Sequence, residues 1–349
     1  MKKRDLIKRG LATAALAATI GLTGAMTNSV SAAEKVTLRM STWLPSGHHL
    51  IADTFPVWIK AIEDASGGTL IIKVDPAPIA GPPAQYDLVR DGAADMAYHV
   101  TAYTPGPFEV LRAVELPFIS PNAEIGSQAA WDWYDRNIGF EKEFKDVKVI
   151  TIMVHGPGVL HSKAKITNLA ELKGVKLRVG GGGVRMAEAL GASPVTVSAP
   201  KAYETIQKGV ATGALFPLES LKGFKLTEVV SNTLIIPGGL YTTPFAIIMN
   251  KDKWNSLSDE HKKVLTDVGG ITGAKILGHG WDVADSVAHE YALKEGTNFT
   301  TISDDELAKW KEKISFMNDD WIKMANGRGH DGAALLKDLN ATVKKISGM

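Results

Sequence analysis

Arg178 is the residue of this 349-residue chain whose surroundings most clearly suggest chemistry. It lies near the end of the apolar run L-K-G-V-K-L-R-V, and the four glycines Gly180 to Gly183 and a helix-like stretch from Val184 follow it. A guanidinium presents two parallel N–H donors, the geometry that captures a carboxylate. Glycines let a ligand approach the backbone, and the following helix start adds free N–H groups. The pattern predicts an anion site, with an ordinary ion pair at a strand end as the competing interpretation.

A nucleotide-binding loop matches these glycines poorly. No Lys-Ser or Lys-Thr pair follows them, as a Walker loop requires, and Arg185 occupies the place of the last glycine of G-x-G-x-x-G.

Several aromatic residues fall at predicted strand ends or in loops, where they could line a pocket. In open α/β sheets, ligands bind at the carboxyl ends of the strands. A position in the core or at its rim is the competing interpretation, because most aromatic side chains are core residues. The residues concerned are Trp43, Tyr98, Tyr103, Phe108, Phe216 and Tyr241.

The parts of a catalytic or metal centre were sought and not found in the sequence. There is no H-E-x-x-H and no G-x-S-x-G motif, and the lack of cysteine excludes thiolate catalysis. His48 and His49 are adjacent, so on a helix or a strand they would point apart. Asp304 to Glu306 follow Ser303 and indicate a helix N-terminus, not a catalytic acid pair. We therefore expect no enzyme, no metal and no cofactor.

The first 33 residues have the composition of an export signal. Five basic residues near the start precede an apolar, alanine-rich stretch from Leu11 to Met26, and Ser31-Ala32-Ala33 provides a cleavage site. We expect cleavage after Ala33 and a periplasmic protein. With Lys3 in the place of the first arginine of a twin-arginine signal, the Sec and Tat routes both stay open.

Charge and hydropathy exclude several classes of partner. Without the signal, 34 basic and 37 acidic side chains remain, a net charge of −3. This gives no basic excess for nucleic acid or an anionic membrane surface. No later stretch is long and apolar enough to span a bilayer, so we expect no direct membrane insertion.

The hydrophobic periodicity predicts two successive α/β units. Strands at 36–41, 69–74 and 96–98 alternate with helices, and a strong apolar strand covers 147–154. The sequence H-G-P-G at 155–158 forms a flexible junction to a second series of short strands that contains Arg178. A ligand cleft between the two units is expected.

The last third of the chain is predicted to be helical. The stretch 258–294 is the longest, and its five glycines from Gly269 to Gly280 indicate a kink or a break. Two more helices are expected after Asp304, the first with Trp310, Met317 and Trp321 on one face.

The whole mature chain resembles the DctP-type solute-binding proteins of tripartite ATP-independent periplasmic (TRAP) transporters. The stretches that carry the resemblance are A-S-G-G-T-L-I-I-K-V at 65–74, L-V-R-D-G-A-A-D-M-A at 88–97, E-L-P-F at 115–118, N-L-A-E-L-K-G-V-K-L-R-V at 168–179 and A-Y-E-T-I-Q-K-G-V-A-T-G at 202–213. They stand in the family's order and spacing.

The resemblance implies a two-lobed α/β fold of the type II periplasmic binding proteins, with a cleft between the lobes and a long kinked helix spanning both. It places lobe I at 34–154 plus about 242–257, lobe II at 155–241, and the spanning and C-terminal helices at 258–349. It also implies capture of a small organic acid for a sodium-coupled membrane permease, with Arg178 as the carboxylate clamp.

Departures from the family pattern suggest the ligand's character. Phe216 replaces an asparagine that contacts the ligand in the family, Leu160 stands in place of a second arginine, and Gly181 stands in place of another asparagine. A polar group at the far end of the ligand would then lack hydrogen-bond partners, which costs roughly 1–3 kcal/mol per buried group. We therefore expect a monocarboxylate with an apolar or aromatic body.

Eight residues form the predicted binding site, and two alternatives stay open. An amino acid or zwitterion could use Glu219 or Glu115 as its cation partner, and a periplasmic enzyme on the same fold is the second alternative. The predicted ligand-binding residues are Arg178, Phe216, Trp43, His49, Tyr98, Gly181, Glu219 and Tyr241.

Overall fold

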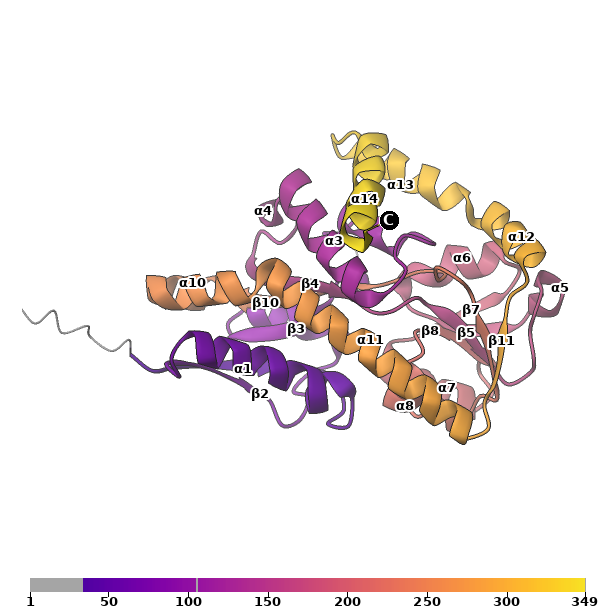
Figure 1. Ribbon diagram of the computed structural model, residues 1–349, viewed down its shortest axis with the longest axis horizontal. Helices are drawn as coiled ribbons and strands as arrows, with labels where there is room; N and C mark the ends of the chain where they lie inside the picture. Colours follow the sequence, from indigo (N-terminus) through magenta and orange to yellow (C-terminus); the bar gives the residue numbers. More distant parts are fainter. Residues whose placement is uncertain (1–33, 105, 349) are drawn as a thin grey trace, which may run out of the picture. The chain divides into compact units, whose positions relative to one another are not determined.

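The computed structural model describes residues 34–104 and 106–348, so the predicted export signal lies outside the described residues. Two mixed β-sheets with helices around them make up this part of the chain (Figure 1). No helix within it is both long and apolar enough to cross a membrane.

The first sheet has the strand order β2-β1-β3-β10-β4. β1 is parallel to β2 and β3, whereas β10 is antiparallel to both of its neighbours. β4 is almost uniformly apolar because it is buried along nearly its whole length. The strands are β1 (Val36–Ser41), β2 (Leu70–Val74), β3 (Met96–Val100), β4 (Val147–Val154) and β10 (Pro244–Asn250).

The second sheet has the order β11-β9-β5-β8-β6-β7, with β5 antiparallel to both neighbours. Sequence analysis missed β11, which pairs in parallel with β9 and brings a strand from beyond residue 258 into this sheet. The strands are β5 (Val159–Ser162), β6 (Lys176–Val179), β7 (Ser193–Thr196), β8 (Gly213–Phe216), β9 (Asn232–Ile235) and β11 (Asn298–Thr301).

Segments at 155–158 and 236–243 carry the chain from the first sheet to the second and back. The H-G-P-G junction predicted from sequence is the first of these segments. The boundaries 34–154 with 242–257, 155–241 and 258–349 stay a prediction.

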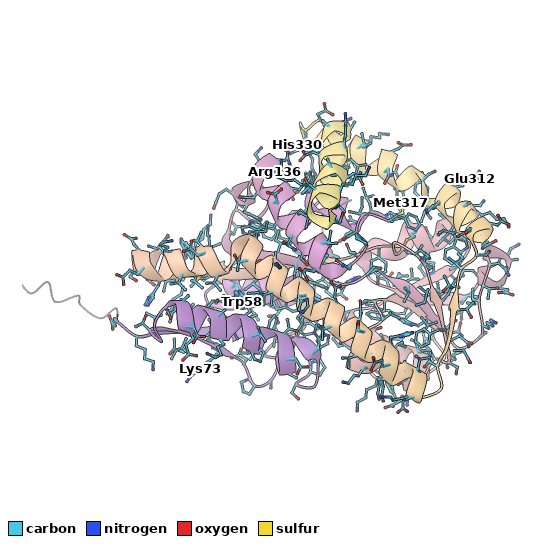
Figure 2. All side chains as sticks on the ribbon, viewed as in Figure 1. Trp58, Lys73, Arg136, Glu312, Met317 and His330 are labelled. Atoms are coloured by element: carbon cyan, nitrogen blue, oxygen red, sulfur yellow. The ribbon has the colours of Figure 1, made fainter. Side chains whose placement is uncertain are left out.

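Helices flank the strands, several of them only one or two turns long. They are α1 (Phe55–Ala65), α2 (Gln85–Arg90), α3 (Ala123–Asn137), α4 (Phe140–Glu143), α5 (Leu169–Leu172), α6 (Val184–Ala189), α7 (Ala202–Gln207), α8 (Ser220–Gly223) and α9 (Lys251–Ser256). A π-helical turn, Leu50–Thr54, runs directly into α1, and Pro56 is the second residue of α1, so the irregular turn lies immediately before the proline. Trp58 lies on the side of α1 that faces α10, and its indole N–H donates to the Val268 carbonyl at 3.1 Å (Figure 2).

The predicted break in the long helical stretch occurs at Gly269. α10 (Asp259–Val268) ends there, and α11 (Gly270–Lys294) then runs without interruption for 25 residues. α11 packs against α3 and β4 and reaches α8, so it contacts elements associated with both sheets (Figure 1).

The C-terminal region has three helices where two were expected: α12 (Asp304–Ile314), α13 (Phe316–Gly327) and α14 (Gly332–Ser347). The apolar face predicted as continuous from Trp310 to Met324 is divided at Ser315. Trp310 packs in the core beside the second sheet, and Trp321 packs in a core beside the first. Because the two side chains pack in different cores, one straight helix does not place both of them.

Candidate ligand-binding site

A cavity of about 460 Å³ lies among elements of both sheets, within the size range of small-molecule sites. Trp43, Tyr98 and Phe245 come from the first sheet and the loop after β1, while Arg178 and Phe216 come from β6 and β8. Trp281 of α11 completes this part of the wall. The structure thus gathers residues separated by more than 200 positions in the sequence.

Arg178 is 2% exposed, and it has no carboxylate partner among the ion pairs of the described residues. Its Nε and Nη2 donate to the Val197 carbonyl at 3.0 and 2.9 Å, and Nη2 lies 3.3 Å from the Tyr103 hydroxyl. Its Cζ lies 3.9 Å from the centre of the Phe216 ring. Because a buried cation without a counter-charge is costly, this arrangement suits an anionic ligand.

The local sequence explains why the guanidinium faces the cavity. Arg178 pairs in register with Ala214 of β8 and Val195 of β7, so it lies within the sheet and not at its edge. Gly181 begins the 3₁₀ turn that follows, between Gly180 and Gly182, which both line the cavity. A Cβ at position 182 would lie 2.6 Å from Glu115 Oε2, so a larger residue there would require the Glu115 side chain to shift.

An unbroken series of aromatic contacts forms the apolar wall of the cavity. Trp43 stacks on Tyr98 with 5.7 Å between ring centres, Tyr98 lies 5.2 Å from Phe245, and Phe245 stacks on Trp281 at 5.6 Å. Sequence analysis missed Phe245 and Trp281 as site residues. Trp281 occurs at the same helical spacing as the apolar core residues around it. The local sequence pattern therefore does not distinguish a ligand-binding residue from a core residue at this position.

Tyr241 also lines the cavity, but its hydroxyl already donates to the Leu215 carbonyl at 3.0 Å. The ring packs edge-on against His155 at 5.1 Å. Tyr241 therefore contributes apolar surface to the site more than a polar contact.

Leu160 does not lie in the cavity wall, contrary to what its proposed alignment with a ligand-binding arginine implied. It is fully buried in the core with Leu177 and Leu215, on the face of the second sheet opposite to Arg178. Side chains alternate between faces along a strand, so any residue at 160 points away from the ligand. Phe216, another of the replacements, does line the cavity.

His49 is the other candidate that the structure separates from the cavity. It lines a different groove, formed by the π-helical turn, α8 and α11. Its Nδ1 lies 3.0 Å from the Thr54 hydroxyl. His48, which sequence analysis did not select, lines the cavity instead.

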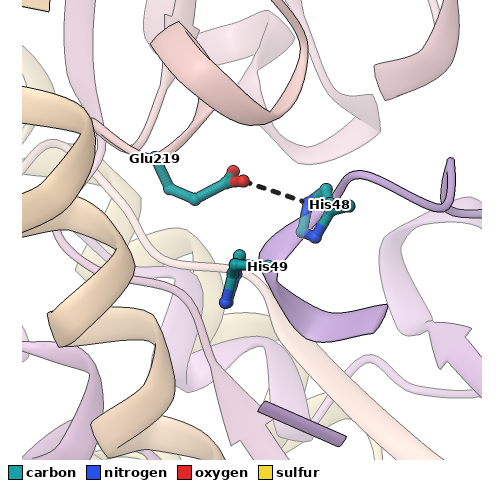
Figure 3. Close-up of side chains that lie close together, drawn as sticks. All are labelled: His48, His49 and Glu219. Carbon is teal, nitrogen blue, oxygen red and sulfur yellow. Dashed lines mark ion pairs between the residues drawn. The ribbon is translucent and has the colours of Figure 1, made fainter. Parts of the chain in front are cut away.

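His48, His49 and Glu219 lie close together, with one possible ligand atom of each within 4.8 Å of the others (Figure 3). The expectation that the adjacent histidines would point apart is wrong, because they begin an irregular turn and their ring centres are 4.8 Å apart. Two imidazoles and a carboxylate are a donor set suited to zinc.

The contacts of the His48 ring favour a neutral hydrogen-bond donor over a metal ligand. The Leu50 N–H donates to His48 Nδ1 at 3.2 Å, which occupies the lone pair there and leaves the ring proton on Nε2. That Nε2–H faces Glu219 Oε1 at 3.4 Å. Burial lowers the pKa of His48 to about 3, so the ring is neutral. In this tautomer the Nε2–H of His48 is directed toward Glu219, and Nε2 offers no lone pair to a metal.

Two buried carboxyl groups line the cavity, and their surroundings differ. Glu115 Oε2 accepts from Arg112 Nε at 3.0 Å, so a cation neutralises it. Glu219 is 2% exposed, and burial and the nearby Asp285 hold its pKa well above the usual range. Its Oε2 has no hydrogen-bond partner within the described part of the chain.

Comparison with known proteins agrees with this architecture. Residues 40–324 match the model of the bacterial extracellular solute-binding proteins, family 7, named DctP. Three solved structures of TRAP solute-binding proteins are similar at TM-scores of 0.84 to 0.85, and each match covers 99% of the other chain.

The first, from Bordetella bronchiseptica, is 33% identical over 89% of this chain and holds (R)- and (S)-mandelate. The second, from Rhodoferax ferrireducens, is 31% identical over 90% and holds copurified benzoate. The third, from an unidentified marine microbe, is 37% identical over 90%, is described as specific for aromatic acid ligands and holds 3-hydroxybenzoate. This chain therefore belongs to the DctP family and is a periplasmic solute-binding protein of the TRAP type, a receptor for an organic acid and not an enzyme.

Proposed function

We propose that this protein captures an aromatic monocarboxylate in the cavity and delivers it to a TRAP membrane permease. The observation that carries the proposal is Arg178, a buried guanidinium without a carboxylate partner among the described residues, stacked on Phe216 and facing an aromatic wall. The similar solved proteins bind mandelate, benzoate and 3-hydroxybenzoate, which share one carboxylate and one ring.

The proposed pose gives each part of such a ligand a partner. Arg178 Nη1 makes no hydrogen bond to the described residues, so it can donate to the carboxylate while Nε and Nη2 stay on Val197. The ring packs between Phe216 and the series from Trp43 to Trp281. Burial of a ring of this size stabilises a complex by about 2–3 kcal/mol.

A dicarboxylate fits this pose poorly. Its second carboxylate would be buried against aromatic rings beside the Glu219 carboxyl. An unpaired buried charge costs several kcal/mol. We expect succinate and other C4-dicarboxylates to be rejected.

Calorimetry with benzoate, mandelate and succinate on the wild type and on Arg178→Ala tests the function. We expect the aromatic acids to bind, succinate not to bind, and the variant to lose all binding while keeping its fold by circular dichroism. Tight binding of succinate, or undiminished benzoate binding by the folded variant, would contradict the proposal.

An amino acid or zwitterion is the second candidate ligand, favoured by the buried carboxyl of Glu219. It would place its carboxylate on Arg178 and its ammonium on Glu219. Phenylalanine and phenylglycine in the same calorimetric series test it, since this candidate predicts that they bind more tightly than phenylacetate.

Delivery to the permease rests on the family alone. Uptake of labelled benzoate into proteoliposomes that hold the cognate permease tests it. We expect transport to require this protein and an inward sodium gradient.

A further inference from the structure

The polar groups left without partners in the cavity wall suggest what lies at the far end of the ligand. Among the described residues, Glu219 Oε2 and the indole nitrogens Trp43 Nε1 and Trp281 Nε1 are buried and make no hydrogen bond. All three side chains line the cavity that contains Arg178. Buried polar atoms normally have partners, so these three call for an explanation. Glu115 Oε1 and Trp321 Nε1 in the same lining also make no hydrogen bond within the described part of the chain, so Glu115 is the carboxyl against which Glu219 must be tested.

Two of these groups only donate and the third can accept. An indole N–H is a donor without a lone pair, whereas a carboxyl oxygen accepts from an N–H or an O–H. The missing partner must therefore accept from an indole and also form a hydrogen bond with the Glu219 carboxyl, which can donate or accept because burial raises its pKa and favours its protonated form. A hydroxyl group does both, whereas an ammonium has no lone pair for the indoles.

Glu219, His48 and Trp281 are connected through direct contacts. His48 Nε2 faces Glu219 Oε1 at 3.4 Å, and the His48 ring packs edge-on against Trp281 with centres 5.8 Å apart. Glu219 Oε1 is thus directed to His48, which leaves Oε2 for another group. The Glu219 N–H donates to Asp285 of α11 at 2.7 Å, so the backbone of this residue is also fixed.

This group of residues is distinct from the Arg178 end of the cavity. Asp285 and Lys222 are the charges that act on Glu219, and Arg178 is not among them. Arg178 instead contacts Val197, Tyr103 and Phe216. The cavity therefore has two polar regions with aromatic surface between them.

We propose that Glu219 and Trp281 bind a hydroxyl group on the aromatic acid whose carboxylate Arg178 holds, so that the preferred ligands are hydroxy-substituted aromatic monocarboxylates. The hydroxyl accepts from Trp281 Nε1 and forms a second hydrogen bond with Glu219 Oε2. This inference rests on the proposed function, because it assumes an aromatic acid in this cavity.

The test is the ratio of affinities for hydroxylated and plain acids, measured by calorimetry. The probes are benzoate, phenylacetate, their 3- and 4-hydroxy derivatives and mandelate. We expect at least one hydroxy acid to bind the wild type roughly tenfold or more tightly than its parent, the scale of one buried hydrogen bond. Glu219→Met and Trp281→Phe should reduce that ratio to near one. The ratio compares two ligands on the same variant, so this expectation holds even where the change weakens binding of the parent acid.

A matched control uses the other buried carboxyl of the cavity. Glu115 Oε2 accepts from Arg112, but Glu115 Oε1 has no hydrogen bond among the described residues, so Glu115→Gln tests the other carboxyl directly. The ratio should stay unchanged, because the inference places the hydroxyl at Glu219. Glu219→Gln keeps an acceptor oxygen and should show an intermediate ratio, which separates loss of the bond from a change in packing.

Two outcomes would overturn the inference. One is a wild-type ratio near one for every hydroxy acid, or a ratio that the Glu219 and Trp281 variants leave unchanged. The other is tighter binding of 3-aminomethylbenzoate, a zwitterion with an ammonium group at the far end, that depends on Glu219. If neither parent nor hydroxy acids bind the wild type, the proposed function itself fails, and this result differs from both of the others.

Discussion

The environment of Arg178 combines three features that a surface ion pair lacks: burial, a stack on Phe216 and two hydrogen bonds to one backbone carbonyl. The Val197 carbonyl fixes the plane of the guanidinium, and the ring of Phe216 supports its face. The orientation of the remaining N–H donors is thereby set before the ligand arrives, which lowers the entropic cost of binding.

Arg178→Lys should therefore behave almost as a loss of the residue. A lysine keeps the charge but cannot bond Val197 through two nitrogens or stack flat on Phe216. We expect benzoate affinity to fall by roughly 100-fold or more, measured by calorimetry. Arg185→Lys is the control: Arg185 also lines the cavity but is exposed and paired with Asp320, so the change should be small.

Asp285 provides a pH-dependent prediction at the same scale. Burial raises the pKa of its carboxyl to about 7, whereas an unfolded Asp titrates near 4. Between about pH 4 and pH 7 the folded state therefore holds more protons than the unfolded state, and stability from this group falls as pH rises.

Asp285→Asn retains the oxygen that accepts from the Glu219 N–H and removes the titration. The melting temperature of the wild type, measured relative to that of the variant, should fall steadily from pH 4 to pH 7 and change little above pH 7. Thermal unfolding in matched buffers measures the difference, and a difference constant over that range would contradict the assigned pKa.

At the scale of elements, glycine has two separate uses in the long helical stretch. Gly269 ends α10 in an extended conformation, while Gly278 lies inside α11 where that helix meets α3. The sequence pattern identified the weak point but could not tell a break from a close contact. The distinction depends on α3, which packs so closely against α11 at Gly278 that no side chain fits there.

Gly278→Ala should destabilise the protein despite alanine's higher helix propensity. A Cβ there would lie 2.7 Å from the Ala123 carbonyl oxygen and the Ser127 hydroxyl, and the backbone oxygen cannot move aside cheaply. We expect a net loss of about 1–2 kcal/mol in the free energy of unfolding. Gly327→Ala in α13 has open space around its Cβ and should be neutral or slightly stabilising in the same urea titration.

At the scale of the whole molecule, the cavity needs both sheets. Arg178 and Phe216 belong to the second sheet, whereas Trp43 and Tyr98 lie with the first. Tyr103 follows β3 in the chain. Its hydroxyl already contacts Arg178 and accepts from the Ala199 N–H at 3.0 Å. A ligand that contacts both sets favours the conformation in which they lie close together.

Saturating benzoate should therefore reduce the radius of gyration of the wild type in small-angle X-ray scattering. Arg178→Ala should show no reduction at the same ligand concentration, and succinate should have no effect on either protein. An unchanged radius in a sample shown to be saturated would mean that binding requires no approach of the lobes.

The sequence by itself determined the strands with strong apolar runs, the helix N-terminus at Ser303 and the break near Gly269, because each depends on neighbours along the chain. It also predicts anion binding by Arg178, which the affinity measurements above test. It could not determine that β11 joins the second sheet, that Leu160 faces away from the cavity, or that His48 replaces His49 in the wall. Nor could it identify Trp281, whose helical spacing is the same whether its ring meets core or ligand. Those outcomes depend on which residues far apart in sequence share a sheet face or a turn, and only the tertiary fold decides that.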